Sequence, residues 1–143
     1  MCVVKRFSFQ DKTLAEQASA IRYEVFVKEQ GIDAALEYDD EEAAHHYLLF
    51  LDDKPVATAR WRETENGIKL ERFAVLPPFR NQGVGAIILK EVLQDVAALG
   101  KTIYLHAQLK AVKFYERNGF LKLGGQFSEA GVEHFMMQYQ SPR

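Results

Sequence analysis

The chain has 143 residues, of which 48% are hydrophobic and 27% charged, and its formal net charge is −2. This length favours one domain, residues 1–143, with a substantial core. The slightly acidic balance argues against nucleic acid or an anionic membrane as a partner, because both attract a basic excess. The printed sequence has no secretory signal pattern and no apolar run of membrane-spanning length, and its single cysteine, Cys2, has no partner for an internal disulfide. We therefore expect a cytoplasmic protein.

The first part of the chain predicts a strand followed by a helix. Apolar and polar residues alternate over residues 3–9, which is typical of a strand. Asp11 or Thr13 can cap the helix that follows, and its apolar stripe runs to about Lys28. Gly31 comes directly after this stripe, and glycine is common where helices end.

Residues 33–42 carry six acidic side chains and no basic one. A solvated loop between helix and strand explains such a run, because like charges repel and stay hydrated. An electrostatic lip that attracts a cationic amine is the alternative interpretation. The sign of the charge does not decide between these two interpretations.

Three consecutive segments then predict antiparallel strands. Residues 46–51 and 54–62 flank the Asp52-Asp53 turn, and Asn66-Gly67 forms a second tight turn before residues 68–75. Strands joined by turns this short pair as neighbours in an antiparallel sheet.

A glycine-containing loop at residues 80–85 joins the last of these strands to a helix predicted over residues 84–99. Backbone N–H groups in the first turn of a helix lack intrahelical partners and carry partial positive charge. Glycines let a bulky anion approach them closely, so the loop predicts a phosphate or pyrophosphate site. A nucleotide-hydrolysing loop needs Lys and Ser/Thr where Ala86 and Ile87 stand, and a dinucleotide fingerprint needs a glycine at Ile88.

The remainder predicts a strand around residues 103–107, a short helix over 111–117 and a final hairpin of residues 120–127 and 134–140. The strand follows the 84–99 helix, so it should run parallel to the strand before that helix. The carboxyl ends of parallel strands are where open α/β sheets bind ligands.

Two motifs together resemble a known family. Residues 80–85 match the pattern Arg/Gln-x-x-Gly-x-Gly/Ala, and Phe114-Tyr115 is followed after three residues by Gly119-Phe120. This combination is similar to the coenzyme A loop and the following helix of the GNAT superfamily of acyl-CoA N-acyltransferases. Residues 21–30 and 131–137 resemble its ElaA/YjcF-like branch, and the resemblance covers nearly the whole chain.

The resemblance implies an α/β (α+β) fold with a mixed, largely antiparallel sheet and helices on both faces. In that fold the central parallel strand pair splays apart and leaves a slot for coenzyme A. It also implies acetyl-CoA as cosubstrate, with no metal. The residues that it places at the cofactor are Phe73, Ala74, Val75, Arg80, Asn81, Gln82, Gly83, Val84, Gly85, Ala86, Gln108 and Phe114.

Three side chains are candidates for the chemistry. The resemblance places Tyr115 next to the sulfur, where a phenol that stays protonated at neutral pH can donate to a thiolate. It offers either His134 or Glu71 as the base, and the ordinary pKa of histidine, near 6.5, favours His134. Arg22 and His46 are candidates for contact with the acceptor, although Arg22 could instead pair with Glu29 or with the acidic segment. His45 and His46 are adjacent in a strand, so their side chains leave opposite faces and cannot together grip a metal.

We predict that the chain is an N-acetyltransferase that transfers acetyl from acetyl-CoA to a primary amine, in a small molecule or a peptide. The amine would attack the thioester directly in a ternary complex. No serine or cysteine stands in a motif that would make it a nucleophile. The alternative is a non-catalytic acetyl-CoA sensor or interaction module, since the loop suits both. A homodimer is compatible with either function.

Overall fold

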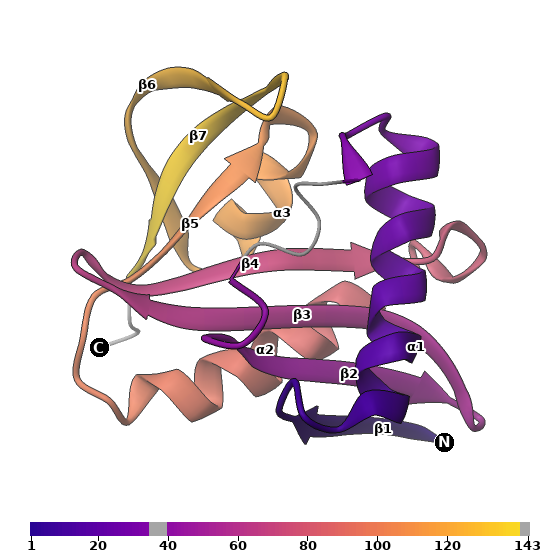
Figure 1. The fold of residues 1–143 in the computed structure, drawn as a ribbon. Helices are drawn as coiled ribbons and strands as arrows, with labels where there is room; N and C mark the ends of the chain where they lie inside the picture. The colour runs from indigo at the N-terminus through magenta and orange to yellow at the C-terminus, as the bar shows by residue number, and fades with distance from the viewer. Residues whose placement is uncertain (35–39, 141–143) are drawn as a thin grey trace.

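The computed structural model describes residues 1–34 and 40–140. Within them the strands form one sheet in the order β1–β2–β3–β4–β5–β7–β6 (Figure 1). The elements are β1 (Cys2–Phe7), α1 (Lys12–Arg22), η1 (Tyr23–Glu29), β2 (His45–Leu51), β3 (Lys54–Thr64), β4 (Gly67–Val75), η3 (Pro77–Phe79), α2 (Val84–Ala97), β5 (Ile103–Gln108), η4 (Leu109–Ala111), α3 (Val112–Arg117), β6 (Phe120–Glu129) and β7 (Val132–Tyr139).

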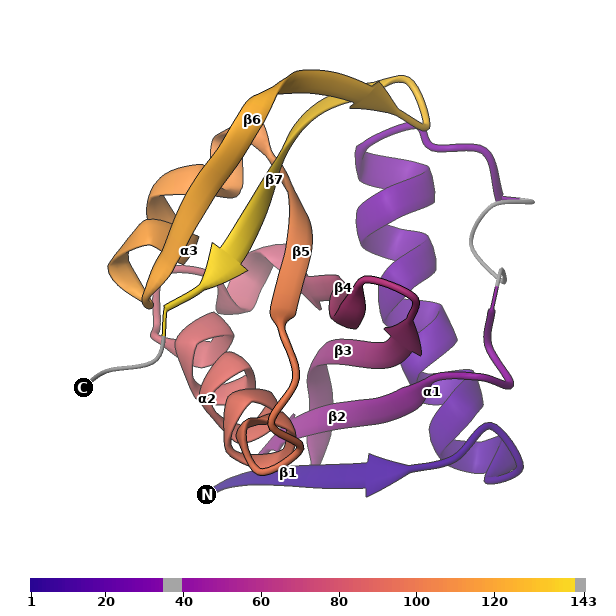
Figure 2. The same cartoon turned by 90° about the vertical axis from the view of Figure 1, so that its left-hand side faces the viewer.

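Helices cover both faces of the sheet, as expected. Figure 2 shows α1 on one side of the strands and α2 and α3 on the other. Strand β2 illustrates the resulting core, because Leu49 packs in the cluster under α2 while Leu48 and Phe50 pack in the cluster under α1. Each fully buried aliphatic side chain of this kind stabilises the fold by roughly 1.5–3 kcal/mol. Both faces of the central strands are therefore fixed by packing.

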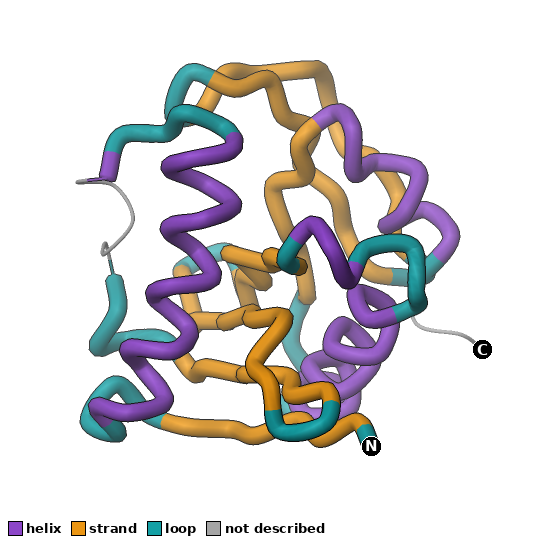
Figure 3. The backbone as a smooth tube through the Cα atoms, turned by 90° about the vertical axis from the view of Figure 1, so that its right-hand side faces the viewer, coloured by secondary structure: helices purple, strands orange, loops and turns teal. Residues whose placement is uncertain are grey.

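The first helix changes its hydrogen-bond pattern halfway along. It begins at Lys12, with the Asp11 carboxylate accepting from the Leu14 amide at 3.2 Å, so Asp11 rather than Thr13 is the cap. From Tyr23 it continues as a π-helix to Glu29, and Figure 3 shows both segments as one long helix. Such widened turns are frequent at functional sites. Here the π-helical turns form the C-terminal end of the first helix. This end lies next to the place where the sheet opens.

The sheet opens between β4 and β5. Their parallel pairing is limited to three residue pairs, from Ile68–Ile103 to Leu70–Leu105, although β4 continues to Val75 and β5 to Gln108. Just beyond the last pair, β4 has a bulge in which residues 72–73 face one residue of β3, and Arg72 has a φ of 56°. A bulge bends its strand and increases its twist. The mixed sheet and the splayed central pair are thus confirmed.

Several predicted boundaries differ from the structure. The first strand ends at Phe7 rather than residue 9, because the Asp11 amide turns back to the Ser8 carbonyl. Helix α2 ends at Ala97, and α3 begins at Val112 after the short η4 segment. The last hairpin is longer than expected: β6 extends to Glu129 and β7 begins at Val132.

Candidate active site

A cleft of about 920 Å³ lies where β4 and β5 diverge. Its walls come from η1, β3, β4, the start of α2, β5, α3 and the β6–β7 hairpin. The three predicted catalytic residues, Glu71, Tyr115 and His134, all line it. So do the predicted cofactor residues apart from Gln82, whose side chain instead donates to the Pro78 carbonyl at 3.2 Å.

The glycine loop forms one end of the cleft, which we call the donor end and define as residues 80–86. Gly83 caps α2 with a φ of 79°, a conformation that glycine adopts without strain. A Cβ added to Gly85 would lie 3.4 Å from the Phe114 ring, which is tighter than most such contacts. The amides of residues 84–86 meet no hydrogen-bond acceptor from the described part of the chain. Amides of this kind at a helix N-terminus are suited to bind an anion.

Arg80 is held beside this loop by three hydrogen bonds. Its Nε donates to the Val75 carbonyl at 2.9 Å, and its Nη atoms donate to both carboxylate oxygens of Glu29 at 2.7 and 2.6 Å. This pair lowers the pKa of the Glu29 carboxyl. Gln108 similarly donates to Gln30 at 2.8 Å. Hydrogen bonds through Arg80 and Gln108 therefore connect the end of η1 to the ends of β4 and β5, the two strands that are predicted to contact the cofactor.

Tyr115 lies in an aromatic cluster at the middle of the cleft. Its ring makes edge contacts with Phe73, Phe114 and Phe120 at centroid distances of 6.3, 5.1 and 5.6 Å. Burial raises the pKa of its phenol above the ordinary value, so the hydroxyl is protonated at neutral pH. No group in the described residues accepts a hydrogen bond from it, which leaves the proton available to a ligand.

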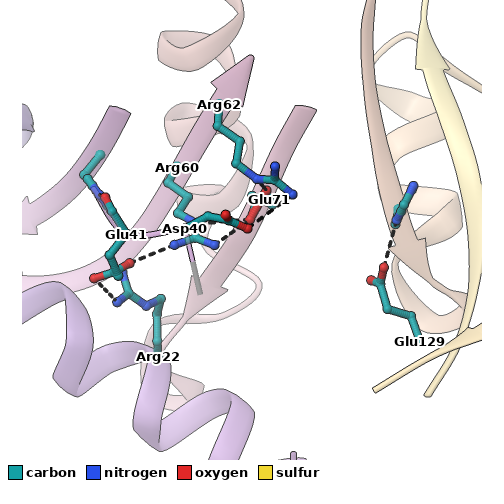
Figure 4. A network of polar contacts seen from close by, with 9 residues as sticks. Arg22, Asp40, Glu41, Arg60, Arg62, Glu71 and Glu129 are labelled. Atoms are coloured by element: carbon teal, nitrogen blue, oxygen red, sulfur yellow. Dashed lines mark hydrogen bonds and ion pairs between the residues drawn. The ribbon is translucent and has the colours of Figure 1, made fainter. Parts of the chain in front are cut away.

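Glu71 lies at the opposite end of the cleft, where it is clamped by two arginines (Figure 4). Its carboxylate accepts from Arg60 Nη2 at 2.6 Å and Nε at 3.1 Å, and from Arg62 Nε at 2.6 Å. Burial opposes ionisation of the carboxyl, but the two guanidinium groups outweigh it and lower the pKa of Glu71. Both oxygens are engaged, so this carboxylate is a weak proton acceptor.

The same network continues behind the wall of the cleft. Arg60 Nη1 and Arg22 Nη2 donate to the two carboxylate oxygens of Glu41 at 2.8 and 2.9 Å. His46 Nε2 donates to the Glu41 carbonyl at 2.9 Å, and burial lowers the pKa of this imidazole. Arg22 and His46, the predicted acceptor contacts, are thus buried in this network and do not line the cleft. We call Arg22, Glu41, Arg60, Arg62 and Glu71 the arginine network.

The acidic segment therefore divides into unlike parts. Glu41 is buried between two arginines, and Asp40 lies 3.6 Å from Arg62 at the edge of the cleft. Glu41 is therefore not a freely solvated loop charge, whereas Asp40 is half exposed. Glu37 and Asp39, which belong to the same predicted lip, lie outside the described residues.

His134 reaches the cleft from β7. Its Nδ1 lies 2.7 Å from the Val132 carbonyl, which can only accept, so Nδ1 carries the proton and Nε2 keeps a lone pair. Nε2 lies 3.8 Å from Glu129 Oε2, and the other oxygen of Glu129 lies 3.0 Å from His106 Nδ1. The residue patterns did not identify Glu129 as a functional residue, because in the sequence it looks like an ordinary acidic residue of a turn. The register of the last hairpin would have placed it beside His134.

Comparison with known proteins agrees with this geometry. The family described as "Acetyltransferase (GNAT) domain" matches residues 10–141. The chain belongs to the GNAT acetyltransferase family. It is thereby an acyltransferase, as the two motifs predicted.

Individual relatives support the assignment. The chain is 39% identical to an uncharacterised N-acetyltransferase, YjcF of Bacillus subtilis (strain 168), over 85% of this chain and 89% of YjcF. Escherichia coli ElaA has the same fold, with a TM-score of 0.87 and 22% identity over 96% of this chain and 99% of ElaA. An aminoglycoside 6'-N-acetyltransferase solved with coenzyme A has a TM-score of 0.78 and 16% identity over 99% of this chain and 98% of that enzyme.

Two further features of the described residues concern membrane-spanning helices and metal sites. None of their helices combines the length and apolar character needed to span a bilayer. Their His, Cys, Asp and Glu side chains nowhere gather in threes with the spacing of a metal site.

Proposed function

We propose that this GNAT enzyme transfers an acetyl group from acetyl-CoA to a primary amine by direct attack in a ternary complex. The observation that carries the proposal is the convergence of three features on one cleft. These are the partnerless amides of residues 84–86, the free hydroxyl of Tyr115 and the available Nε2 of His134.

The donor end fits coenzyme A. Amides at the start of α2 can accept the pyrophosphate, and the absence of a side chain at Gly85 keeps the approach to them open beside Phe114. The diverging strands offer Ala74, Val75 and Gln108 to the extended pantetheine arm. When bound, acetyl-CoA supplies the acetyl group as a thioester. That a GNAT structure of the same fold was solved with coenzyme A supports this placement.

Proton movement falls to two side chains. An amine enters as its ammonium ion, and His134 Nε2 accepts the proton that must leave before the nitrogen can attack. Tyr115 donates its hydroxyl proton to the leaving sulfur, and the second proton of the attacking nitrogen restores the phenol. One proton is released to solvent for each acetyl group transferred. The saturated hydrogen bonding of Glu71 favours His134 as the base.

The acceptor enters from the end opposite the glycine loop, where the cleft is lined by Arg60, Arg62, Lys69, Glu71 and Arg72. A small-molecule amine and a peptide amine both remain candidates. Arg22 and His46 support this wall from behind through Glu41. A homodimer stays a prediction, which light scattering of the purified protein can test.

Release of free thiol from acetyl-CoA across a panel of amines, with mass spectrometry of the products, tests the proposal. We expect thiol release that depends on the amine and matches the amount of acetylated product. Tight coenzyme A binding without turnover on any amine would contradict it. That result would instead indicate a sensor or interaction module.

A further inference from the structure

Three titratable side chains lie on one face of the last strands. Residues paired across neighbouring strands point to the same face, as do residues two apart in one strand. His134 pairs with Gln108, two residues from His106, and Glu129 pairs with Val132, two residues from His134. The register therefore brings His106, Glu129 and His134 together at the acceptor end of the cleft, and all three line it.

Their contacts form a chain. His106 Nδ1 lies 3.0 Å from one oxygen of Glu129, and His134 Nε2 lies 3.8 Å from the other. His134 is buried, whereas the Glu129 side chain is 43% exposed. The ring of Phe127 stacks on His134 at 5.8 Å and makes an edge contact with His106 at 5.0 Å. Both imidazoles are thereby held in place around the Glu129 carboxylate.

We propose that Glu129 is a positioning residue that stabilises the protonated form of His134, and that His106 in turn holds Glu129. This inference rests on the proposed function, because it assigns a partner to the proposed base.

The proton balance is simple. The ammonium acceptor gives one proton to His134 Nε2, and its nitrogen keeps the electron pair of the broken N–H bond. The neutral imidazole becomes an imidazolium cation, with Nδ1–H still donating to the Val132 carbonyl. The cation then forms next to the Glu129 carboxylate and later releases the proton to solvent. An opposite charge within 4–6 Å favours the charged form of a titrating group.

Glu129 is suited to this role because it stays ionised. The hydrogen bond from His106 lowers the pKa of its carboxyl to about 2, with Lys69 and His134 adding to the effect. Among residues 1–34 and 40–140, the charged or titratable groups that face the pair are His106 on β5 and Lys69 on β4. Glu71, on β4, is already held by Arg60 and Arg62. Glu129 is therefore the carboxylate that can respond to charge on His134.

The test compares Glu129→Gln with Glu133→Gln in the free protein. Glu133 is an exposed carboxylate of the same hairpin, adjacent to His134 in sequence but on the other face. Ring-nitrogen NMR follows the protonation of His134 against pH without any substrate. We expect the titration curve of Glu129→Gln to move to lower pH than that of the parent protein, because the imidazolium loses its counter-charge. Glu133→Gln should leave the midpoint in place.

A second variant, His106→Phe, keeps the aromatic ring and removes the donor. It should make the Glu129 carboxyl titrate nearer its ordinary value of about 4.3. With an accepted amine, the acidic limb of the kcat/KM profile should move to lower pH in Glu129→Gln by the same interval as the NMR midpoint.

An unchanged His134 midpoint in Glu129→Gln, or equal shifts in both glutamine variants, would overturn the inference. A shifted midpoint in a protein that transfers no acetyl group would instead uphold the coupling and contradict the proposed function. The two failures are thus distinguishable.

Discussion

The two ends of the cleft are built in different ways. The donor end is one continuous stretch of backbone, residues 80–86, in which the amides of residues 84–86 are available and the shape is set by the conformation of Gly83 and the space beside Gly85. The acceptor end uses charged side chains, and Arg60 reaches Glu41 across 19 residues of sequence. A backbone site tolerates changes in its side chains, whereas a buried charge network depends on each member. The donor end should therefore be specific to the cofactor, and the acceptor end should carry more of the stability.

The largest effect should come from Arg60→Met at the acceptor end. Arg60 is 1% exposed and pairs with both Glu41 and Glu71, so its loss leaves two buried carboxylates short of a partner. We expect a loss of about 3–5 kcal/mol in the free energy of unfolding, measured in urea. Lys101→Met breaks the exposed Lys101–Glu63 pair and should cost about 0–1 kcal/mol. Similar losses in both variants would contradict this difference.

Tyr115→Phe tests the middle of the cleft. Removal of the proposed acid should reduce turnover about 100-fold, while coenzyme A affinity, measured by calorimetry, stays within about twofold because the ring and its packing remain. Tyr139→Phe is the matched control, since Tyr139 packs against Phe120 outside the cleft. Unchanged turnover in Tyr115→Phe would remove Tyr115 from the mechanism.

Gly85→Val tests the donor end. The new side chain presses on Phe114 and covers the helix start, so at least one charge-assisted hydrogen bond to the pyrophosphate should be lost. Such a bond contributes about 1.5–3 kcal/mol, which corresponds to a roughly 10–100-fold weaker coenzyme A affinity. Gly125→Val, at an open position on β6, should bind normally. Equal affinities for both variants would argue against the loop as the binding site.

The smallest effect concerns acid stability. The pKa of Glu71 is lowered in the folded protein, so its ionised form adds stability at pH values above its unfolded pKa, about 4.3. That contribution to stability is lost as the pH falls from the unfolded pKa of Glu71 through its lower pKa in the folded protein. Urea midpoints between pH 6 and pH 3 should decline in the parent protein and decline less steeply in Glu71→Gln. Parallel curves would show that Glu71 is not the titrating group.

The difference between the ends also explains what the sequence could predict. The strand–loop–helix order, the glycine loop and the parallel pair follow from local patterns and chain connectivity, and the structure confirms the predicted fold around them. The acidic segment could be named as a possible partner of Arg22, but Glu41 could not be singled out within it, because the charge pattern of that segment also fits a solvated loop. The partner of His46 could not be predicted. The π-turn at Tyr23–Glu29 and the bulge at Arg72 likewise leave no periodic signature in the sequence.

Backbone amide NMR during a titration with coenzyme A tests the central claim most directly. We expect the largest shifts at the amides of Val84, Gly85 and Ala86, which have no acceptor among the described residues of the free protein. Smaller shifts should follow along the ends of β4 and β5. Saturable binding that leaves these three amides unshifted would contradict the assignment of this helix start as the cofactor site.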